Sequence, residues 1–540
     1  MKPGLKDTAV LRARRHLPVL FITLCLVCAT GKAAAAVNAD LVLTNGRVFT
    51  GDPAKPWAEA VAIAGERIVA VGSAAEILAK AGKANTVDLG GRLLVPGIND
   101  AHDHAGAVSF GVEARTQRPP MDDPTLAEVA EAVRKASAGA PAGAWIWLTT
   151  GATAMFDPAG TRAAIAKAAG EHPVLIKSWW GHGVILNDAG LKALEIGQDV
   201  VDPPGGRYQR DASGRLNGKL EEYAGWMVLE KLHSSASPAA AVEDFRAYAA
   251  RRLAEGVTSV QIMAGNLAPK MFVRTVAQAD TLLRVRLVPF PMPASPHADA
   301  IAAWRPLYNR NRPGTRIFGV KWLIDGTPID GNAWSTRPYS GRFSGHGYLN
   351  FDQAFVGREL SRAIASGEQL LLHVTGDATM AYILDAMEKI APPERWRPLR
   401  TRIEHSKGLQ GDLMRRAAAL GIIVAQPRQS TPIRDLMSAA ITVAYGSDEA
   451  FGPFLAMKQM TSASNPQAIT REQAMLALTH GGAWAEFAEK NKGRIMPGML
   501  ADLVVLSQDV LAVPEAQLPK TRSLMTIVGG KMAYRALEFR

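Results

Sequence analysis

The middle of the chain, between about residues 94 and 489, alternates short apolar runs with longer stretches of helical periodicity. Amphipathic stretches such as 354–365 and 412–419 lie between most of the runs. Apolar runs that alternate with helices are typical of a parallel sheet covered by helices. The eight runs are 94–100, 257–263, 285–290, 317–324, 369–373, 402–405, 422–426 and 442–447. Eight such units predict an α/β protein of the (β/α)8 or TIM-barrel class.

Both ends of the chain instead show the two-residue alternation of strands, at 40–73 and at 500–530. Neither end has enough strands for a sandwich of its own. We therefore predict one small β-sandwich that residues 37–94 and 490–540 form together. The barrel then takes residues 95–489, and the stretch 105–256 after its first strand is too long for one loop. We expect that stretch to be an inserted subdomain that covers the mouth of the barrel.

The first 36 residues have the pattern of a bacterial signal peptide. Five cationic residues precede an apolar segment at 17–29, and small residues follow it at 33–36. The apolar segment is too short for a membrane span, which needs about 20 residues, although a retained anchor stays an alternative. Arg14 and Arg15 precede the apolar segment, so twin-arginine export stays an alternative to export by the Sec pathway. We expect a periplasmic or secreted protein with no stable membrane span after cleavage.

Composition narrows the classes of partner and site. The 540 residues are 48% hydrophobic and 21% charged, which fits a globular protein and excludes a disordered one. Cys25 and Cys28 are the only cysteines and both lie in the signal segment, which excludes a disulfide framework or a cysteine-based zinc site. The net charge of +11 falls to about +6 without residues 1–36, and no Lys/Arg block suggests a nucleic-acid partner. A small molecule is the expected partner, and a homo-oligomer is left open.

Polar residues stand where five of the predicted strands end, and these ends meet on one face of a barrel. His102 and His104 stand two apart in an extended segment, so both rings can reach one ion while Asp103 points away. With them stand Lys321, His373, His405 and Asp448. A lone histidine is usually structural, but four imidazoles and a carboxylate at one face predict a divalent metal site. Zinc is its most natural occupant, and manganese, iron and cobalt share these ligands.

These residues and their surroundings resemble the amidohydrolase superfamily, and within it the YtcJ-like branch that includes N-substituted formamide deformylases. The resemblance covers residues 38–535 and rests on an ordered series of phrases. They are Val-Pro-Gly-Ile-Asn-Asp-Ala-His-Asp-His at 95–104, Val-Lys-Trp-Leu-Ile-Asp-Gly-Thr at 320–327, His-Val-Thr-Gly-Asp-Ala at 373–378, Arg-Ile-Glu-His-Ser at 402–406 and Tyr-Gly-Ser-Asp at 445–448. The chain departs from the branch at Thr379, Met380 and Glu449, where an Arg and a small residue are common.

The resemblance implies roles for the site residues. His102 and His104 would hold a first metal, His373 and His405 a second, and Asp448 would bind metal and act as the general base. Lys321 would carry a carbamate that bridges two zinc ions. The alternative for Lys321 is an ion pair with a carboxylate such as Asp325, in which case the site would hold a single ion.

The predicted enzyme is an exported metal-dependent amidohydrolase that hydrolyses an amide or formamide-like C–N bond by attack of metal-activated hydroxide. The expected substrate-binding residues are His182, which would also serve catalysis, Trp179, Trp322 and Asp325. Alternatives on the same barrel are ester hydrolysis, deamination or isomerisation. A catalytically idle member that binds a small molecule or regulates another process is a further alternative.

Overall fold

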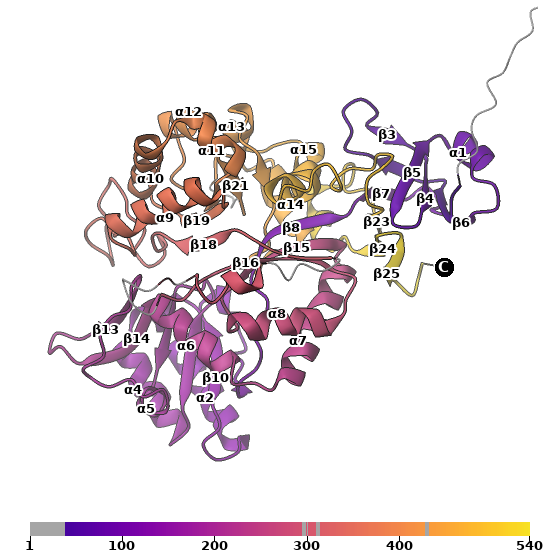
Figure 1. Ribbon diagram of the computed structural model, residues 1–540. Helices are drawn as coiled ribbons and strands as arrows, with labels where there is room; N and C mark the ends of the chain where they lie inside the picture. Colours follow the sequence, from indigo (N-terminus) through magenta and orange to yellow (C-terminus); the bar gives the residue numbers. More distant parts are fainter. Residues whose placement is uncertain (1–37, 294–298, 300, 309–313, 427–430, 540) are drawn as a thin grey trace, which may run out of the picture. The chain divides into compact units, whose positions relative to one another are not determined.

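The computed structural model describes residues 38–539 apart from 294–298, 300, 309–313 and 427–430, and it is a mixed α/β protein (Figure 1). The predicted signal peptide at 1–36 lies outside the described residues. Among the helices that are described, none combines the length and apolar character needed to cross a membrane.

Nine parallel strands form the two sheets that carry the site. One sheet has the order β17-β16-β15-β8 and the other β18-β19-β20-β21-β22, and every neighbouring pair in both is parallel. The first contains β8 (Ile98–Asp103), β15 (Val257–Ala264), β16 (Arg284–Pro289) and β17 (Thr315–Ile317). The second contains β18 (Val320–Leu323), β19 (Leu370–Val374), β20 (Arg402–His405), β21 (Ile423–Ala425) and β22 (Val443–Ala444).

Backbone hydrogen bonds connect the edges of these two sheets. The amide of Phe318 donates to the carbonyl of Leu287 at 3.3 Å, and the amide of Ala101 donates to the carbonyl of Tyr445 at 2.8 Å. The run 317–324, predicted as one strand, is divided at Gly319, whose φ of +79° turns the chain between β17 and β18. The strands β15 and β19 are buried along their whole length, as expected for parallel strands covered by other elements.

Helices alternate with these strands along the chain (Figure 1). They include α7 (Pro238–Ala254), α8 (Pro269–Ala279), α9 (Gln353–Ser366), α10 (Asp377–Ile390), α12 (Asp412–Ala419) and α14 (Pro453–Thr461). Local sequence sets their ends: the Asp352 side chain accepts a hydrogen bond from the first turn of α9, and Gly367 ends that helix with a φ of +71°. Shorter helices are α1 (Ala74–Lys80), α11 (Pro393–Trp396), α13 (Ile433–Ser438), α15 (Arg471–Leu476) and α16 (Gly482–Ala485).

Segments from both ends of the chain share one six-stranded sheet. Its order is β25-β24-β23-β7-β2-β3, with β2 (Arg47–Phe49), β3 (Trp57–Ala58), β7 (Leu93–Pro96), β23 (Leu503–Leu506), β24 (Ser523–Val528) and β25 (Lys531–Arg535). A four-stranded sheet, β5-β4-β1-β6, adds β1 (Leu41–Thr44), β4 (Ala60–Ala64), β5 (Arg67–Gly72) and β6 (Asn85–Asp88). One apolar cluster, with Leu43, Ile63, Leu94, Leu503 and Ile527, joins side chains of both sheets.

The predicted first barrel strand at 94–100 needs a correction. The structure divides it at Gly97: β7 pairs with β23 and β2 in the terminal sheet, and β8 begins one residue later and pairs with β15. The side chain of Thr258 packs directly against Gly97, so a larger residue would collide with it there. Glycine at this position lets the chain pass from one sheet to the other.

The stretch after β8 forms a sheet of its own, in the order β13-β14-β12-β11-β10-β9. Its strands are β9 (Val112–Glu113), β10 (Ile146–Thr150), β11 (Val174–Ser178), β12 (Gly183–Leu186), β13 (Gly206–Arg210) and β14 (Leu216–Glu222). The helices of the same stretch are α2 (Leu126–Gly139), α3 (Ala152–Phe156), α4 (Pro158–Ala169), α5 (Asp188–Ala193) and α6 (Tyr223–His233). The helix α7 falls within the predicted insertion 105–256, yet it packs against α8 and β15 and so belongs with the parallel sheets.

Candidate metal centre and substrate cavity

Three potential ligands converge where β8 and β22 end. His102 and His104 lie on the same side of the extended end of β8, and their Nε2 atoms are 3.3 Å apart. Oδ1 of Asp448, in the loop after β22, lies 3.5 Å from Nε2 of His102 and 3.4 Å from Nε2 of His104. Among the described residues these three are the group whose ligand atoms all lie within 4.8 Å of one another.

The spacing and protonation of this triad fit a divalent ion. Zinc with bonds of about 2.0–2.1 Å in a tetrahedral site separates its ligand atoms by roughly 3.3–3.4 Å, which is close to the three distances found here. Burial lowers the pKa of His104 to about 3, so its ring is neutral near pH 7. A neutral imidazole offers the lone pair that a metal requires.

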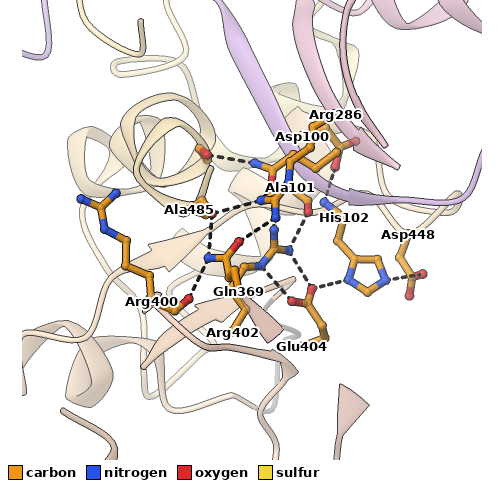
Figure 2. A network of polar contacts seen from close by, with 12 residues as sticks. Asp100, Ala101, His102, Arg286, Gln369, Arg400, Arg402, Glu404, Asp448 and Ala485 are labelled. Carbon is orange, nitrogen blue, oxygen red and sulfur yellow. Dashed lines mark hydrogen bonds and ion pairs between the residues drawn. The ribbon is translucent and has the colours of Figure 1, made fainter. Parts of the chain in front are cut away.

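Glu404, at the end of β20, fixes the orientation of His102. Its carboxylate bonds Nδ1 of His102, which leaves Nε2 of that ring directed toward Asp448 (Figure 2). Nε2 of His104 lies beside the same atom. Arg402 donates to both oxygens of Glu404 at 2.9 Å, to Gln261 and to the carbonyl of Ala101. Burial raises the pKa of Glu404, but Arg402 and His102 lower it more, so the net shift is downward and the carboxylate is ionised.

The backbone around Asp448 is held in an unusual conformation. Asp448 and Glu449 have φ angles of +51° and +63°, a region that residues other than glycine rarely adopt. Three hydrogen bonds from consecutive amides hold this turn against β8: Ser447 to the Asp100 carboxylate, Asp448 to the His102 carbonyl and Glu449 to the Asp103 carboxylate. These contacts fix Asp448 relative to the two imidazoles.

The two acids under that turn are themselves buried and paired. The Tyr248 hydroxyl donates to Asp103 at 2.6 Å, and Arg252 forms ion pairs with Asp100 and Asp103. Asp103 therefore points away from the imidazoles, as the sequence predicts. Its carboxylate organises the backbone on both sides of the candidate site.

Two further predicted ligands, His373 and His405, line the same cavity. The His405 ring centroid lies 5.2 Å from that of His102 and 4.5 Å from that of His373. Nδ1 of His405 bonds Gln426, and Nε2 of His373 lies 3.3 Å from the carbonyl oxygen of Gly326. All six residues predicted from strand ends thus line one cavity. Of these six, His102, His104 and Asp448 have ligand atoms within 4.8 Å of one another.

Lys321 is 1% exposed and faces the same cavity. Burial lowers its pKa to about 8, against the opposing effect of Glu404 and Asp448. The alternative pairing with Asp325 needs a correction, because the Asp325 carboxylate accepts hydrogen bonds from the amides of Thr375 and Gly376 and from the Thr379 hydroxyl. Asp325 therefore holds the loop after His373.

The cavity has a volume of about 660 Å³ and largely apolar walls. Trp179, Trp180, Trp226, Leu323 and Phe451 contribute to those walls. Trp179 and Trp180 come from the stretch after β11, so the six-stranded sheet of the insertion supplies part of the cavity wall. This space suits a small molecule with apolar bulk.

Two predicted substrate-binding residues do not reach this space. Trp322 is 1% exposed and packs edge-on against Phe351 and Phe355, because it points to the opposite side of β18 from Lys321. Asp325 is fully buried, and its carboxylate binds the backbone of the loop after His373. Trp322 is therefore a core residue and Asp325 a structural acid.

His182 does line the cavity, from the start of β12. Its ring centroid lies 4.6 Å from that of His373, and its Nδ1 bonds both oxygens of Glu222 at 3.0 and 2.9 Å. Burial lowers the pKa of His182, but Glu222 raises it more, so the net shift is upward. Sequence reasoning missed both Glu222 and Glu404, since nothing in their local spacing shows which histidine each one contacts.

Comparison with known proteins now identifies the family. A model described as "Amidohydrolase family" matches residues 85–534. The chain therefore belongs to the amidohydrolase family. The resemblance predicted from the motifs is confirmed, and with it the prediction of an enzyme of this hydrolase class.

Two curated relatives and one solved structure extend this match. The amidohydrolase is 27% identical to Protein LONG AFTER FAR-RED 3 of Arabidopsis thaliana, over 93% of this chain and 92% of the relative. It is 25% identical to an N-substituted formamide deformylase of Arthrobacter pascens, over 92% and 98%. Its fold is similar to that of an uncharacterized metal-dependent hydrolase from Pyrococcus horikoshii OT3, with a TM-score of 0.65, 18% identity, and coverage of 88% and 99%.

Proposed function

We propose that this amidohydrolase is an exported, metal-dependent hydrolase of an amide or formamide-like C–N bond. The observation that carries the proposal is the triad His102, His104 and Asp448, whose ligand atoms have tetrahedral spacing and which line a 660 Å³ cavity. The two connected parallel sheets support a closed (β/α)8 barrel, with the site at the carboxyl ends of its strands. The deformylase relative supports the bond type.

The proposed metal ligands are His102, His104 and Asp448, with His373 and His405 available for a second ion. When bound, a divalent ion such as zinc lowers the pKa of water to about 7 and polarises a carbonyl oxygen. Lys321 lies beside these residues, and its buried amine is the proposed carrier of a carbamate. Whether the site holds one ion or two, and whether Lys321 carries a carbamate, are separate parts of the proposal.

The protein's own residues would then carry the proton chemistry. Asp448 accepts the proton of the attacking water and passes it to the leaving nitrogen, which departs as an amine. His182 lines the cavity, and its Nε2 would form a hydrogen bond with the substrate, as an acceptor from the N–H when the ring is neutral and as a donor to the carbonyl when the ring is protonated. The tryptophan walls exclude water and hold the apolar part of the substrate.

The test is metal analysis of the purified mature chain, followed by a panel of N-formyl and N-acyl amines assayed with each added metal. The panel includes matched esters and amino-substituted heterocycles, which report ester hydrolysis and deamination. We expect turnover of N-formyl or N-acyl compounds that Asp448→Asn abolishes without loss of fold. A chain that binds these compounds and turns over none of the panel would be an idle binder.

The proposed export has a separate test, because residues 1–36 carry the signal-like sequence and lie outside the described structure. Expression of the full chain in a bacterium should yield a periplasmic product whose amino terminus lies near residue 37. A cytoplasmic product that keeps residue 1 would overturn this part of the proposal and leave the chemistry unaffected.

A further inference from the structure

Glu222 combines two features that rarely occur together. It stands between β14 and α6 with φ +52° and ψ −127°, a conformation that strongly favours glycine. Its side chain is also buried, with the residue only 2% exposed. A strained backbone under a buried carboxylate persists only where the surroundings hold it, and such residues cluster at functional sites.

The contacts of Glu222 lead directly to the cavity. Both of its oxygens bond Nδ1 of His182, at 3.0 and 2.9 Å. Its Oε1 also packs so closely on Gly326 that a side chain at that glycine would approach it to 2.8 Å. The carbonyl of Gly326 in turn contacts His373 and accepts the hydroxyl of Thr375 at 2.6 Å. Glu222 thus lies between His182 and the Gly326 loop that contacts His373.

The next residue anchors the same junction from the other side. The Tyr223 hydroxyl accepts a hydrogen bond from the amide of Leu323, at 3.1 Å, in the strand that carries Lys321. Gly205 and Gly206 pack against Tyr223 and Ala224 so tightly that neither site has room for a side chain. The junction cannot relax its backbone without moving these contacts, and this explains how the strain at Glu222 is maintained.

We infer that Glu222 is a positioning residue that fixes the orientation and tautomer of His182. A carboxylate on Nδ1 keeps the proton on that nitrogen, and so Nε2 is the nitrogen directed to the substrate. For the residues that the structure describes, the hydrogen bonds of the His182 ring are those at Nδ1. This inference rests on the proposed function, since it assigns His182 a role toward the substrate of that reaction.

Replacement by glycine separates positioning from folding. Glu222→Gly removes the carboxylate but suits the backbone at +52°, so the variant should fold. Glu222→Gln keeps one acceptor oxygen and serves as the conservative rescue. The matched control is Glu221→Gln, since Glu221 is the adjacent buried acid but pairs with Lys219 at 3.1 Å and does not line the cavity.

The first readout needs no substrate. In protein with ¹⁵N-labelled histidines, with the His182 signals assigned through His182→Asn, we expect Nδ1 protonated and Nε2 unprotonated when the ring is neutral. Glu222→Gly should shift His182 toward a mixture of tautomers, Glu222→Gln should restore much of the Nδ1–H form, and Glu221→Gln should change nothing. An unchanged His182 spectrum in a folded Glu222→Gly variant would overturn the inference, even if the enzyme hydrolyses nothing.

The second readout uses whichever panel compound the wild type hydrolyses. Supporting groups of this kind typically contribute 10- to 100-fold, so Glu222→Gly should lower kcat by roughly that factor while KM changes little. Glu222→Gln should recover part of the loss. Wild-type kcat in Glu222→Gly would overturn the inference and leave the proposed hydrolase intact. No turnover by the wild type would instead count against the proposed function, and the ¹⁵N result would still decide the inference.

Discussion

The carboxylate of Glu404 bonds Nδ1 of His102, so the same ring presents Nε2 to His104 and Asp448. Each partner is almost completely buried, and Arg402 holds the carboxylate from behind with two hydrogen bonds of 2.9 Å (Figure 2). The predicted ligand is therefore oriented by a residue that does not itself line the cavity. This arrangement is common behind metal-bound histidines in proteins.

Loss of that carboxylate should weaken metal binding. We expect Glu404→Gln to lower the affinity for zinc by roughly 10- to 100-fold, because the amide is a weaker acceptor for the Nδ1 proton. Competition with a chromogenic chelator near neutral pH measures this. Glu486→Gln is the matched control, because Glu486 is also a buried acid but its carboxylate contacts Asn99 and Lys492. Equal affinities for wild type and Glu404→Gln would contradict the assigned role.

The hydrogen bond of Tyr248 should matter for catalysis through the backbone of Asp448. Tyr248→Phe removes the 2.6 Å bond to Asp103, whose other oxygen accepts the amides of His104 and Glu449. We expect a stability loss of about 1–2 kcal/mol and a several-fold lower kcat. Tyr308→Phe removes a bond of 2.6 Å to Glu368 outside the cavity, so it should lower stability alone. A kcat equal to that of this control would refute the link.

Substitutions at Trp322 and Trp179 should affect different properties, protein stability and substrate binding respectively. Trp322 is fully buried, so Trp322→Ala should cost about 3–5 kcal/mol in the free energy of unfolding. Trp179 is half-buried at the cavity wall, so Trp179→Ala should mainly raise KM for substrates with apolar bulk. Chemical denaturation and steady-state kinetics measure the two effects. A large KM change in a folded Trp322 variant, such as Trp322→Phe, would restore it as a binding residue.

Glu230 predicts how stability depends on pH away from the metal centre. Burial on α6 raises its pKa from 4.5 to about 7, so the folded state favours the protonated acid. The native chain then binds more protons than the unfolded chain between about pH 4.5 and 7, and stability from this group falls as pH rises through that window. Glu230→Gln should remove this loss and become more stable than wild type above pH 7, by up to about 3 kcal/mol.

Denaturation of wild type and Glu230→Gln at a series of pH values measures that difference. Glu243→Gln is the control, because Glu243 is exposed on α7 and pairs with Arg246. The difference between wild type and Glu230→Gln should grow with pH while the control stays parallel to wild type. Parallel curves for all three proteins would show that Glu230 titrates normally.

The sequence predicted much of this site because strand ends in parallel α/β proteins meet at one face. His102, His104, Lys321, His373, His405 and Asp448 are far apart in the chain, yet all six line one cavity. That outcome needs only the order of strands and the position of each residue at a strand end. The family prediction follows from the same residues and is confirmed.

The errors have equally physical causes. Trp322 follows Lys321 directly in β18, and successive side chains of a strand point to opposite faces of the sheet. This alternation places Trp322 on the face opposite Lys321. The sequence predicts that Asp325 contacts the substrate or Lys321, but its carboxylate accepts hydrogen bonds from the Thr375 and Gly376 amides and the Thr379 hydroxyl. Glu404 and Glu222 were missed because their roles depend on contacts across 302 and 40 residues, and spacing along the chain carries no sign of such contacts.

The central claim is that His102, His104 and Asp448 bind a divalent metal. Its most direct test is an anomalous difference map at the zinc absorption edge from crystals of the zinc-loaded enzyme. We predict a peak bonded to Nε2 of both histidines and to the Asp448 carboxylate, absent in crystals of His104→Ala. Full zinc loading with no peak among these three residues would contradict the account.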